Sequence, residues 1–290
     1  MVPIRKLVNT ALQAYEEKWG YIWGKSGQTW TQAQQNAATR AQSVQYGQKW
    51  VGKRVADCSG LFVFAYRENG MSIYHGSNTI WNKHLVPESR GALAGQIKIR
   101  YGSPVFQNVN GKRTHIGWYV GGGMVEEERG TKTGCILSPL ATWDEYGELA
   151  DADYTGEVYE QFNIIPPDAV RKGSKSEVVR WVQNCLIEAG YDVGDDGADG
   201  IYGTETVSAV RSFQRDHNLT PDGIAGAKTY AALKALVVDD EPDEDKPVEA
   251  PDEPQEPPVS IPDAIPLTVE ERLTRLERAV FGQEGGIPNV

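Results

Sequence analysis

The chain has only three cysteines, four histidines and three methionines among its 290 residues. Three cysteines cannot all pair, which argues against a fold held together by disulfides. The sequence contains neither a C-x-x-C pair nor a histidine cluster, so we expect no metal site and no cofactor. It also lacks an apolar run of membrane length, and its mean hydropathy is −0.47, so we predict that it does not bind a membrane.

Negative charge is in excess, but only near the C-terminal end. The formal net charge is −11. Residues 1–163 carry 17 basic and 15 acidic side chains, residues 164–238 carry 8 and 10, and residues 239–290 carry 4 and 15. Most of the chain is therefore close to neutral and offers no concentrated basic face. This argues against nucleic acid as a partner.

One cysteine has the surroundings of a nucleophile. Asp57-Cys58-Ser59-Gly60 leads into an apolar stretch, which predicts a helix over 58–69 that ends at Asn69-Gly70. A cysteine at a helix start is favoured as the reactive thiolate. His115 opens the run His-Ile-Gly-Trp-Tyr-Val-Gly, an expected strand, and an imidazole there can take the thiol proton. Taken alone, the two residues also fit a small buried cysteine and a core histidine.

These two elements resemble the NlpC/P60 family of cell-wall cysteine peptidases, over about residues 3–160. The resemblance implies an α+β, papain-like catalytic domain in residues 1–163, with Cys58 as nucleophile and His115 as base. Strands expected at 104–106, 116–120 and 124–128 fit that class, because helices come first and an antiparallel sheet follows.

The family also places a third polar residue on the next strand, where it orients the imidazole. Glu127 lies twelve residues after His115, beyond a turn of three glycines, and many family members have histidine there. Successive strand residues face opposite ways, so Glu126 and Glu128 should point away from Glu127. A register shifted by one residue would give the orienting role to Glu126 instead.

An aromatic element lies upstream, at Trp19-Gly20-Tyr21-Ile22-Trp23-Gly24. It resembles the family's Y-V-W-G element, which lines the substrate groove, although residues 25–57 separate it from the nucleophile here. It also fits an aromatic core cluster. The resemblance implies a set of substrate-binding residues, namely Tyr21, Trp23, Asp57 and Ser59.

A second domain is expected over residues 168–237, where the chain repeats itself. Residues 199–206 recur as 222–229, and each copy reads as a glycine-dependent turn followed by a helix. With an earlier helical pattern at 176–189, this predicts a small three-helix α domain that resembles the type 1 peptidoglycan-binding domain. The acidic run at 195–199 lacks the ligand spacing of a calcium loop and is interpreted as a turn.

The remaining cysteines and histidines carry no motif. Cys185 falls in the apolar pattern of the expected helix 176–189 and is interpreted as a core residue, and Cys135 as a structural one. We assign no chemistry to the histidines outside the His115 motif, which are His75, His84 and His217.

The C-terminal end consists of two segments. Residues 238–266 are rich in proline, glutamate and aspartate, which predicts a disordered acidic linker. Residues 267–282 predict a short amphipathic helix, with Val269, Leu273, Leu276 and Val280 on one stripe. Such a helix is marginal alone, so it either docks on a domain of this chain or makes a homo-oligomer.

Both resemblances point to peptidoglycan as the partner. They imply a peptidoglycan hydrolase that cuts the γ-D-glutamyl–diamino acid bond, with a CHAP-like N-acetylmuramoyl-L-alanine amidase or a non-catalytic wall-binding or virion protein as alternatives. The first residues show no signal-peptide core, so we expect synthesis in the cytoplasm and action on the wall after release, as in a phage endolysin. We expect residues 1–163 alone to keep the chemistry on soluble muropeptides.

Overall fold

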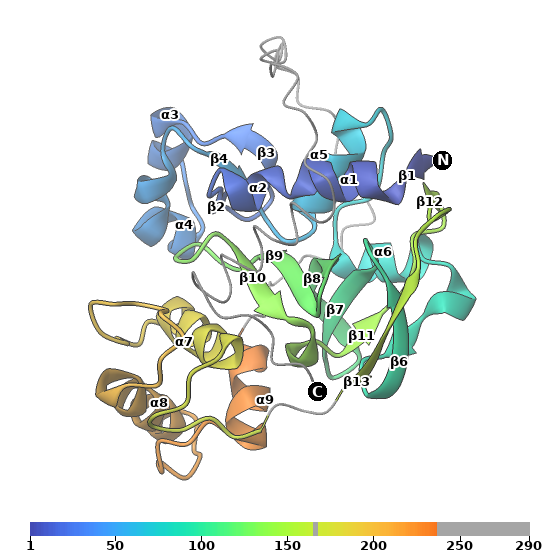
Figure 1. The fold of residues 1–290 in the computed structure, drawn as a ribbon. Coiled ribbons are helices and arrows are strands. Elements are labelled where there is room, and N and C mark those ends of the chain that lie inside the picture. The colour runs from blue at the N-terminus through green and yellow to red at the C-terminus, as the bar shows by residue number, and fades with distance from the viewer. Residues whose placement is uncertain (165–167, 237–290) are drawn as a thin grey trace, which may run out of the picture. The chain divides into compact units, whose positions relative to one another are not determined.

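The computed structural model describes residues 1–164 and 168–236, which belong to one compact unit (Figure 1). The predicted linker, 238–266, and the predicted C-terminal helix, 267–282, lie outside the described residues. Homo-oligomer formation through that helix therefore stays a prediction.

The helices of the N-terminal domain mostly precede its main sheet in the chain. One face of α1 is buried, because its apolar residues recur at helical spacing, and this helix packs on α5. The helices are α1 (Ile4–Ala11), α2 (Gln13–Glu16), α3 (Gln32–Asn36), α4 (Ala41–Tyr46), α5 (Gly60–Glu68) and α6 (Ser77–Lys83). Three short 3-10 turns are η1 (Gly47–Trp50), η2 (Pro87–Ser89) and η3 (Leu140–Thr142).

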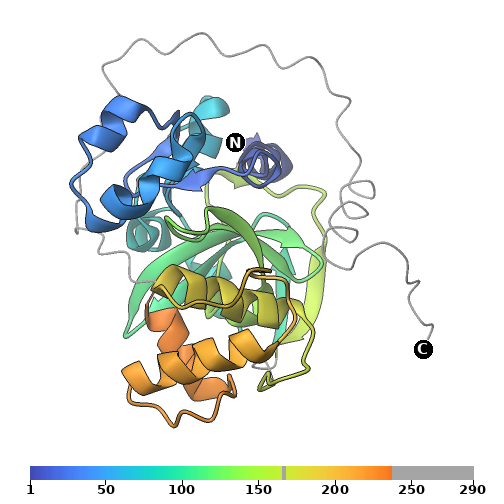
Figure 2. The ribbon, with the colours of Figure 1, turned by 90° about the vertical axis from the view of Figure 1, so that its left-hand side faces the viewer.

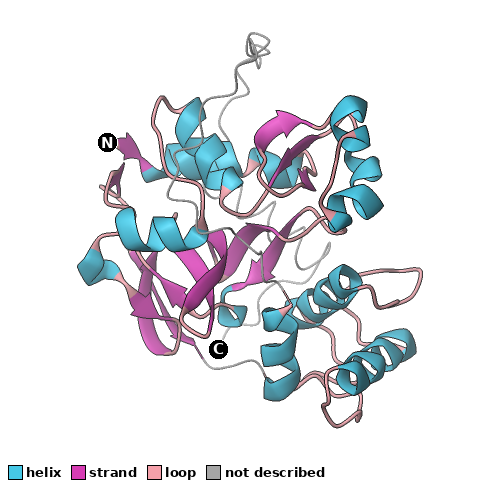
Figure 3. Cartoon of the chain, turned by 180° about the vertical axis from the view of Figure 1, so that it is seen from behind, coloured by secondary structure: helices cyan, strands magenta, loops and turns pink. Residues whose placement is uncertain are grey.

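An antiparallel sheet is the framework of this domain, drawn in magenta in Figure 3. Its strand order is β10-β9-β8-β7-β11-β5. Its strands are β5 (Gly91–Ala92), β7 (Pro104–Val109), β8 (Lys112–Gly121), β9 (Met124–Glu128), β10 (Cys135–Pro139) and β11 (Glu145–Tyr146). Helix α6 packs on β8. Helices followed by an antiparallel sheet confirm the predicted α+β class.

A small sheet brings the aromatic element close to the nucleophile, although the two lie far apart in the sequence. Strand β2 (Gly20–Tyr21) runs parallel to β4 (Arg54–Ala56), and β3 (Ser26–Thr29) pairs with β4 from the other side. Tyr21 is thereby the pairing partner of Ala56, two residues before Cys58. The intervening segment folds on a core of its own, made of Ile22, Trp30, Trp50 and Val55.

Two further strand pairs close the N-terminal domain. Strand β1 (Val2–Pro3) runs parallel to β12 (Ala152–Asp153), and β6 (Gly95–Arg100) pairs antiparallel with β13 (Tyr159–Ile164). The beginning and the end of the domain are thus tied to one another.

The second domain contains three helices in the part of it that the structure describes, as predicted (Figure 2). They are α7 (Glu177–Ala189), α8 (Thr204–Asp216) and α9 (Ala227–Ala235). The repeat is visible in its hydrogen bonds. The Gln183 amide donates to Asp199 and Thr206 and accepts from the N–H of Gly200. The second copy makes the same bonds from the Gln214 amide, to Asp222, Thr229 and the N–H of Gly223.

Helices α7 and α9 contact the antiparallel sheet of the N-terminal domain, at β10 and β7 respectively. The Glu188 carboxylate accepts hydrogen bonds from the backbone N–H of Lys132, at 3.0 Å, and from the Thr133 hydroxyl, at 2.9 Å. A Cβ atom on Gly130 would overlap the carboxyl group of Glu188. A side chain at this position would therefore displace the Glu188 carboxylate from its place on the loop after β9.

Candidate active site

Cys58 lies in the short connection between β4 and α5. The helix begins at Gly60, two residues later than predicted, with Ser59 as its N-cap residue. The Oδ1 atom of Asp57 accepts the backbone N–H of Gly60 at 2.7 Å. A side chain at Gly60 would overlap the carbonyl oxygen of Lys25, so the nucleophile turn packs directly on the neighbouring backbone.

Asp57 organises the surroundings of the nucleophile. Its Oδ2 atom accepts the backbone N–H of Gly24 at 2.6 Å, and its Oδ1 lies 2.7 Å from Nε2 of His75. Burial alone would raise the pKa of Asp57, but His75 and the two backbone N–H groups outweigh burial and lower it. The carboxylate is therefore held ionised, next to Cys58.

His75 was assigned no chemistry from the sequence, and in the structure it contacts Asp57. It stands in the loop between α5 and α6, with its side chain 17% exposed, and no residue pattern around it indicates a role. Only the folded chain brings it to Asp57.

The four predicted substrate-binding residues differ in their burial and in their contacts. Tyr21 and Ser59 are buried near Cys58, and the Ser59 hydroxyl donates to Asp57 at 3.3 Å. Trp23 is half-buried, and its ring lies 4.5 Å from the Arg40 guanidinium. Asp57 already binds four groups of the protein itself, so its role towards substrate stays a prediction.

His115 and Glu127 lie together on one face of the β8–β9 hairpin. Nε2 of His115 is 2.6 Å from Oε2 of Glu127, and both side chains are fully buried. Trp118 pairs with Glu126, so continuing the register by one residue sets Gly117 opposite Glu127 and His115 diagonally across. Diagonal neighbours on a sheet are within reach of long side chains.

The glycine in the His-Ile-Gly motif makes room for Trp143. The rings of His115 and Trp143 stack with centroids 5.4 Å apart and planes 14° apart. A Cβ atom on Gly117 would lie 2.9 Å from the Trp143 ring and 2.8 Å from the carbonyl oxygen of Glu126. Sequence reasoning did not place Trp143 in the site, since a tryptophan after β10 gives no signal of its own.

Two further residues hold the Glu127 carboxylate. Arg129, whose side chain is fully buried, approaches Oε2 of Glu127 to 3.3 Å. Ser138 of β10 also donates to the carboxylate and accepts from the Trp143 indole at 3.0 Å. Burial alone would raise the pKa of Glu127, but Arg129, His115 and Ser138 lower it to about 2. Glu127 is thus a carboxylate at any physiological pH.

Glu126 and Glu128 face the other side of the strand, as predicted. Both side chains are buried there. Glu126 lies 3.6 Å from the sulfur of Cys135, and Glu128 pairs with Cys135 across the strands. Burial raises the pKa of Glu126 to about 8 and that of Glu128 well above its ordinary value. The structure therefore places Glu127, and not Glu126, beside the imidazole.

The helix after Cys58 and the strand of His115 are in direct contact. Phe62 of α5 stacks on Trp118 of β8, with centroids 3.9 Å apart and planes 9° apart. With Nε2 of His115 engaged by Glu127, the other ring nitrogen, Nδ1, has no hydrogen-bond partner among the described residues. This leaves one nitrogen for proton transfer, while the carboxylate fixes the orientation of the ring.

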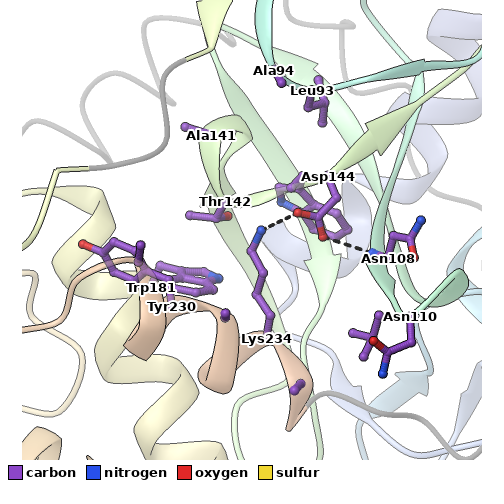
Figure 4. A pocket seen from close by; sticks show the side chains of 15 residues that line it. Leu93, Ala94, Asn108, Asn110, Ala141, Thr142, Asp144, Trp181, Tyr230 and Lys234 are labelled. Atoms are coloured by element: carbon purple, nitrogen blue, oxygen red, sulfur yellow. Dashed lines mark hydrogen bonds and ion pairs between the residues drawn. The ribbon is translucent and has the colours of Figure 1, made fainter. Parts of the chain in front are cut away.

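A cavity of about 610 Å³ lies between the two domains and shares one residue with this site (Figure 4). Its walls include Asn108 and Trp143 from the first domain, and Trp181 and Tyr230 from the second. The Asp144 carboxylate accepts from Lys234 of α9, at 2.6 Å, and from the backbone N–H of Asn108, at 3.0 Å. Trp143 thus separates the interdomain cavity from His115.

Among residues 1–164 and 168–236, no group of three or more His, Cys, Asp or Glu side chains is arranged to hold a metal ion. In the same residues, no helix combines the length and the apolar character needed to cross a membrane. The three cysteines are all free thiols.

Comparison with known families agrees with this geometry. The NlpC/P60 family model matches residues 19–145, and the peptidoglycan binding domain model matches residues 175–233. The chain carries an NlpC/P60 domain followed by a peptidoglycan-binding domain. The predicted pair of resemblances is confirmed, and the NlpC/P60 match contains Cys58, His115 and Glu127.

Individual relatives match the chain over limited stretches. The N-acetylmuramoyl-L-alanine amidase CwlL of Bacillus licheniformis is 40% identical over 67 residues, which is 23% of this chain and 19% of the amidase. The type VI secretion system spike protein VgrG3 of Vibrio cholerae is 37% identical over 82 residues, 24% of this chain and 8% of the spike protein. The chain therefore spans less than a fifth of the length of these curated relatives.

Among solved structures, the peptidoglycan hydrolase RipB from Mycobacterium tuberculosis is 18% identical. The match covers 56% of this chain and 64% of RipB, with a TM-score of 0.31.

Proposed function

We propose that this chain is a peptidoglycan hydrolase in which Cys58 is the nucleophile, His115 the general base and Glu127 the orienting residue. The observation that carries the proposal is the 2.6 Å contact between Nε2 of His115 and Glu127, in an NlpC/P60 domain with Cys58 at its helix start. The peptidoglycan-binding domain that follows supports the wall polymer as the substrate.

The mechanism follows from the placement of these groups. His115 takes the proton of the Cys58 thiol at Nδ1, and the thiolate attacks the carbonyl carbon of the scissile amide. Glu127 stabilises the imidazolium that forms, as the buried carboxylate of a catalytic triad does. The backbone N–H of Cys58, just before α5, stabilises the oxyanion of the tetrahedral intermediate.

Collapse of the intermediate breaks the C–N bond, and the imidazolium returns its proton to the leaving amine. Water then attacks the thioester, with His115 again as base, and releases the acid product together with the free thiol. The protein supplies every proton transfer through one ring nitrogen, so no further co-reactant is required.

We propose the γ-D-glutamyl–diamino acid bond as the one that is cut. CwlL, which matches less than a quarter of this chain, is named as an amidase that acts at the muramoyl–L-alanine bond. Mass spectrometry of muropeptides after digestion distinguishes the two, because each bond leaves a different new amino terminus. A new terminus on L-alanine would overturn the endopeptidase proposal in favour of the amidase.

The nucleophile is tested by Cys58→Ala. This variant should bind walls normally but lose hydrolysis, since a methyl group fills the space of the thiol without its chemistry. Cys135→Ser is the matched control, because its sulfur contacts Glu126 on the opposite face of β9. Hydrolysis by Cys58→Ala at a rate comparable to the unaltered protein would exclude the cysteine mechanism.

We further propose that the protein acts as a lytic enzyme on the bacterial wall, as an endolysin does. Two domains directed at one polymer support this role. Added protein should lower the turbidity of cells whose walls are accessible, and Cys58→Ala should not. Intact turbidity in the presence of active enzyme would point to wall remodelling or virion entry instead of lysis.

A further inference from the structure

Arg129 connects the candidate catalytic residues with the peptidoglycan-binding domain. One guanidinium nitrogen lies 3.3 Å from Oε2 of Glu127, and the other donates to the sulfur of Cys185 on α7 at 2.9 Å. The guanidinium carbon also lies 5.8 Å from the ring centre of Trp181, one helical turn earlier on α7. The side chain is fully buried, so water does not replace either partner.

In this contact the sulfur of Cys185 is a neutral hydrogen-bond acceptor. Burial raises the pKa of Cys185 to about 12, so the group is a thiol at neutral pH. It therefore fixes one side of the guanidinium without neutralising it. The positive charge remains directed at Glu127, which is the only carboxylate that an Arg129 nitrogen contacts in the described residues.

A buried cation in this place decides the ionisation of the orienting residue. The Glu127 carboxylate faces His115 of β8, Ser138 of β10 and Arg129, and the buried side chains of Glu128 and Cys185 also lie within electrostatic range. Burial favours the protonated acid, and Arg129 is the strongest influence that opposes it. A protonated Glu127 could no longer stabilise an imidazolium.

A second contact between the domains reaches the other support of His115. Lys234 of α9 binds Asp144, as Figure 4 shows. Asp144 is the residue next to Trp143, which stacks on His115. Glu188 of α7 accepts two hydrogen bonds from the loop that follows Arg129. The binding domain thus touches the neighbours of both groups that hold the imidazole.

We propose that Arg129 is a positioning residue for the His115–Glu127 pair and that α7 of the peptidoglycan-binding domain holds Arg129 in place. The inference rests on the proposed hydrolase function of Cys58. Docking of the binding domain then sets the rate of bond cleavage itself, in addition to bringing the enzyme to the wall.

The first test measures Glu127 directly and needs no substrate. Carboxyl ¹³C NMR of the full chain, with Glu127 assigned by its loss in Glu127→Gln, gives the pH at which this group titrates. In Arg129→Gln the midpoint should rise by more than one pH unit, because burial then acts without the cation. The midpoint in Arg129→Lys should lie between those of the unaltered protein and of Arg129→Gln. An unchanged midpoint in Arg129→Gln overturns the positioning role.

The second test measures kcat and KM on a soluble muropeptide, where wall anchoring contributes nothing. Cys185→Ala should lower kcat about tenfold with little change in KM, and Cys185→Ser, which retains an acceptor, should keep more of the rate. The acid limb of the pH–rate profile should move upward in Cys185→Ala. Wall sedimentation shows whether each variant still has a folded binding domain.

Asp216→Ala is the matched control for the second test. Asp216 accepts the Tyr191 hydroxyl at 2.9 Å within the binding domain, so its removal perturbs that domain without removing a partner of Arg129. Equal kcat and equal pH profiles for Cys185→Ala, Asp216→Ala and the unaltered chain overturn the role of α7. If the unaltered chain cleaves no muropeptide, the hydrolase proposal fails, while the NMR result for Glu127 still decides the role of Arg129.

Discussion

At the residue scale, Glu127 combines full burial with full ionisation. Its pKa of about 2 depends on three donors that come from three different strands or strand ends. The spacing along the sequence was enough to predict the contact between Glu127 and His115, because a glycine turn sets the register of a hairpin. The contacts of Arg129, Ser138 and His75 could not be predicted from the sequence. They form only in the tertiary fold, and no local pattern indicates them.

Replacement of Glu127 by glutamine should slow hydrolysis without abolishing it. The amide oxygen still accepts the imidazole N–H, but the negative charge that stabilises the imidazolium is lost. We expect kcat to fall about tenfold or more, and by less than the ~10²–10⁴-fold that removal of a general base typically costs. Kinetics on soluble muropeptides, with His115→Ala measured beside it, would contradict the assignment if Glu127→Gln were fully active.

Glu126 should make the native state less stable as the pH rises. Its folded pKa is about 8 against an ordinary value of 4.5, so the folded protein binds more protons than the unfolded chain between these values. The free energy of unfolding therefore falls as the pH rises from about 4.5 to about 8, and the loss is complete above that range.

Glu126→Gln removes this contribution, because an amide does not ionise. Relative to the unaltered protein, the variant should be more stable at about pH 9 than at about pH 5, by on the order of a few kcal/mol. Urea unfolding at the two pH values measures the difference. Glu205→Gln, at an exposed position of α8, should leave the pH dependence unchanged.

At the element scale, the start of α5 shows where sequence reasoning was accurate and where it was not. The apolar run and Asn69-Gly70 predicted this helix, and the structure ends it at Glu68 with Asn69 as cap. The predicted beginning was two residues early, because the helix starts at Gly60 with Ser59 as its N-cap residue. Boundaries depend on such caps more than on periodicity.

Gly60→Ala should disrupt this turn. The new methyl group would overlap the Lys25 carbonyl, a backbone atom that cannot rotate away, so α5 or β3 must shift. We expect a loss of about 1–3 kcal/mol in stability and a large loss of activity, because Cys58 moves with the helix start.

Gly203→Ala provides the comparison for that prediction. Gly203 also precedes a helix, but its Cβ would meet only the flexible end of Glu205 at 3.3 Å. Its cost should stay below about 1 kcal/mol. Equal costs for the two alanines in thermal unfolding would show that the Lys25 contact does not constrain the nucleophile turn.

At the scale of the whole molecule, both domains were predictable from sequence, but their contact was not. Motifs for each domain are local, whereas the contact joins side chains 56 positions apart, such as Arg129 and Cys185. Cys185 does belong to the core of its domain, as predicted, yet its sulfur also reaches Arg129. The expectation that residues 1–163 alone keep the chemistry on soluble muropeptides stays a prediction, and the proposed role of α7 adds that their rate should be lower than that of the full chain.

The two domains should unfold together as long as α7 stays docked. Glu188→Ala removes the acceptor of two hydrogen bonds from the loop after β9, so the binding domain loses part of its hold on the sheet. Calorimetry should show one transition for the unaltered protein and two for the variant. Two transitions in both proteins would mean that the docking contacts contribute little to cooperativity.

The Arg129–Cys185 contact limits how freely the parts of this protein can be exchanged. Wall-lytic enzymes invite engineering by fusion, in which one catalytic module receives a new targeting module with another host range. Here the first module buries an arginine whose second partner belongs to the other one, so a foreign module would leave a guanidinium donor unpaired or exposed to water. A successful chimera of this protein must therefore keep α7, or offer an acceptor in the place of Cys185, whatever surface it is meant to recognise.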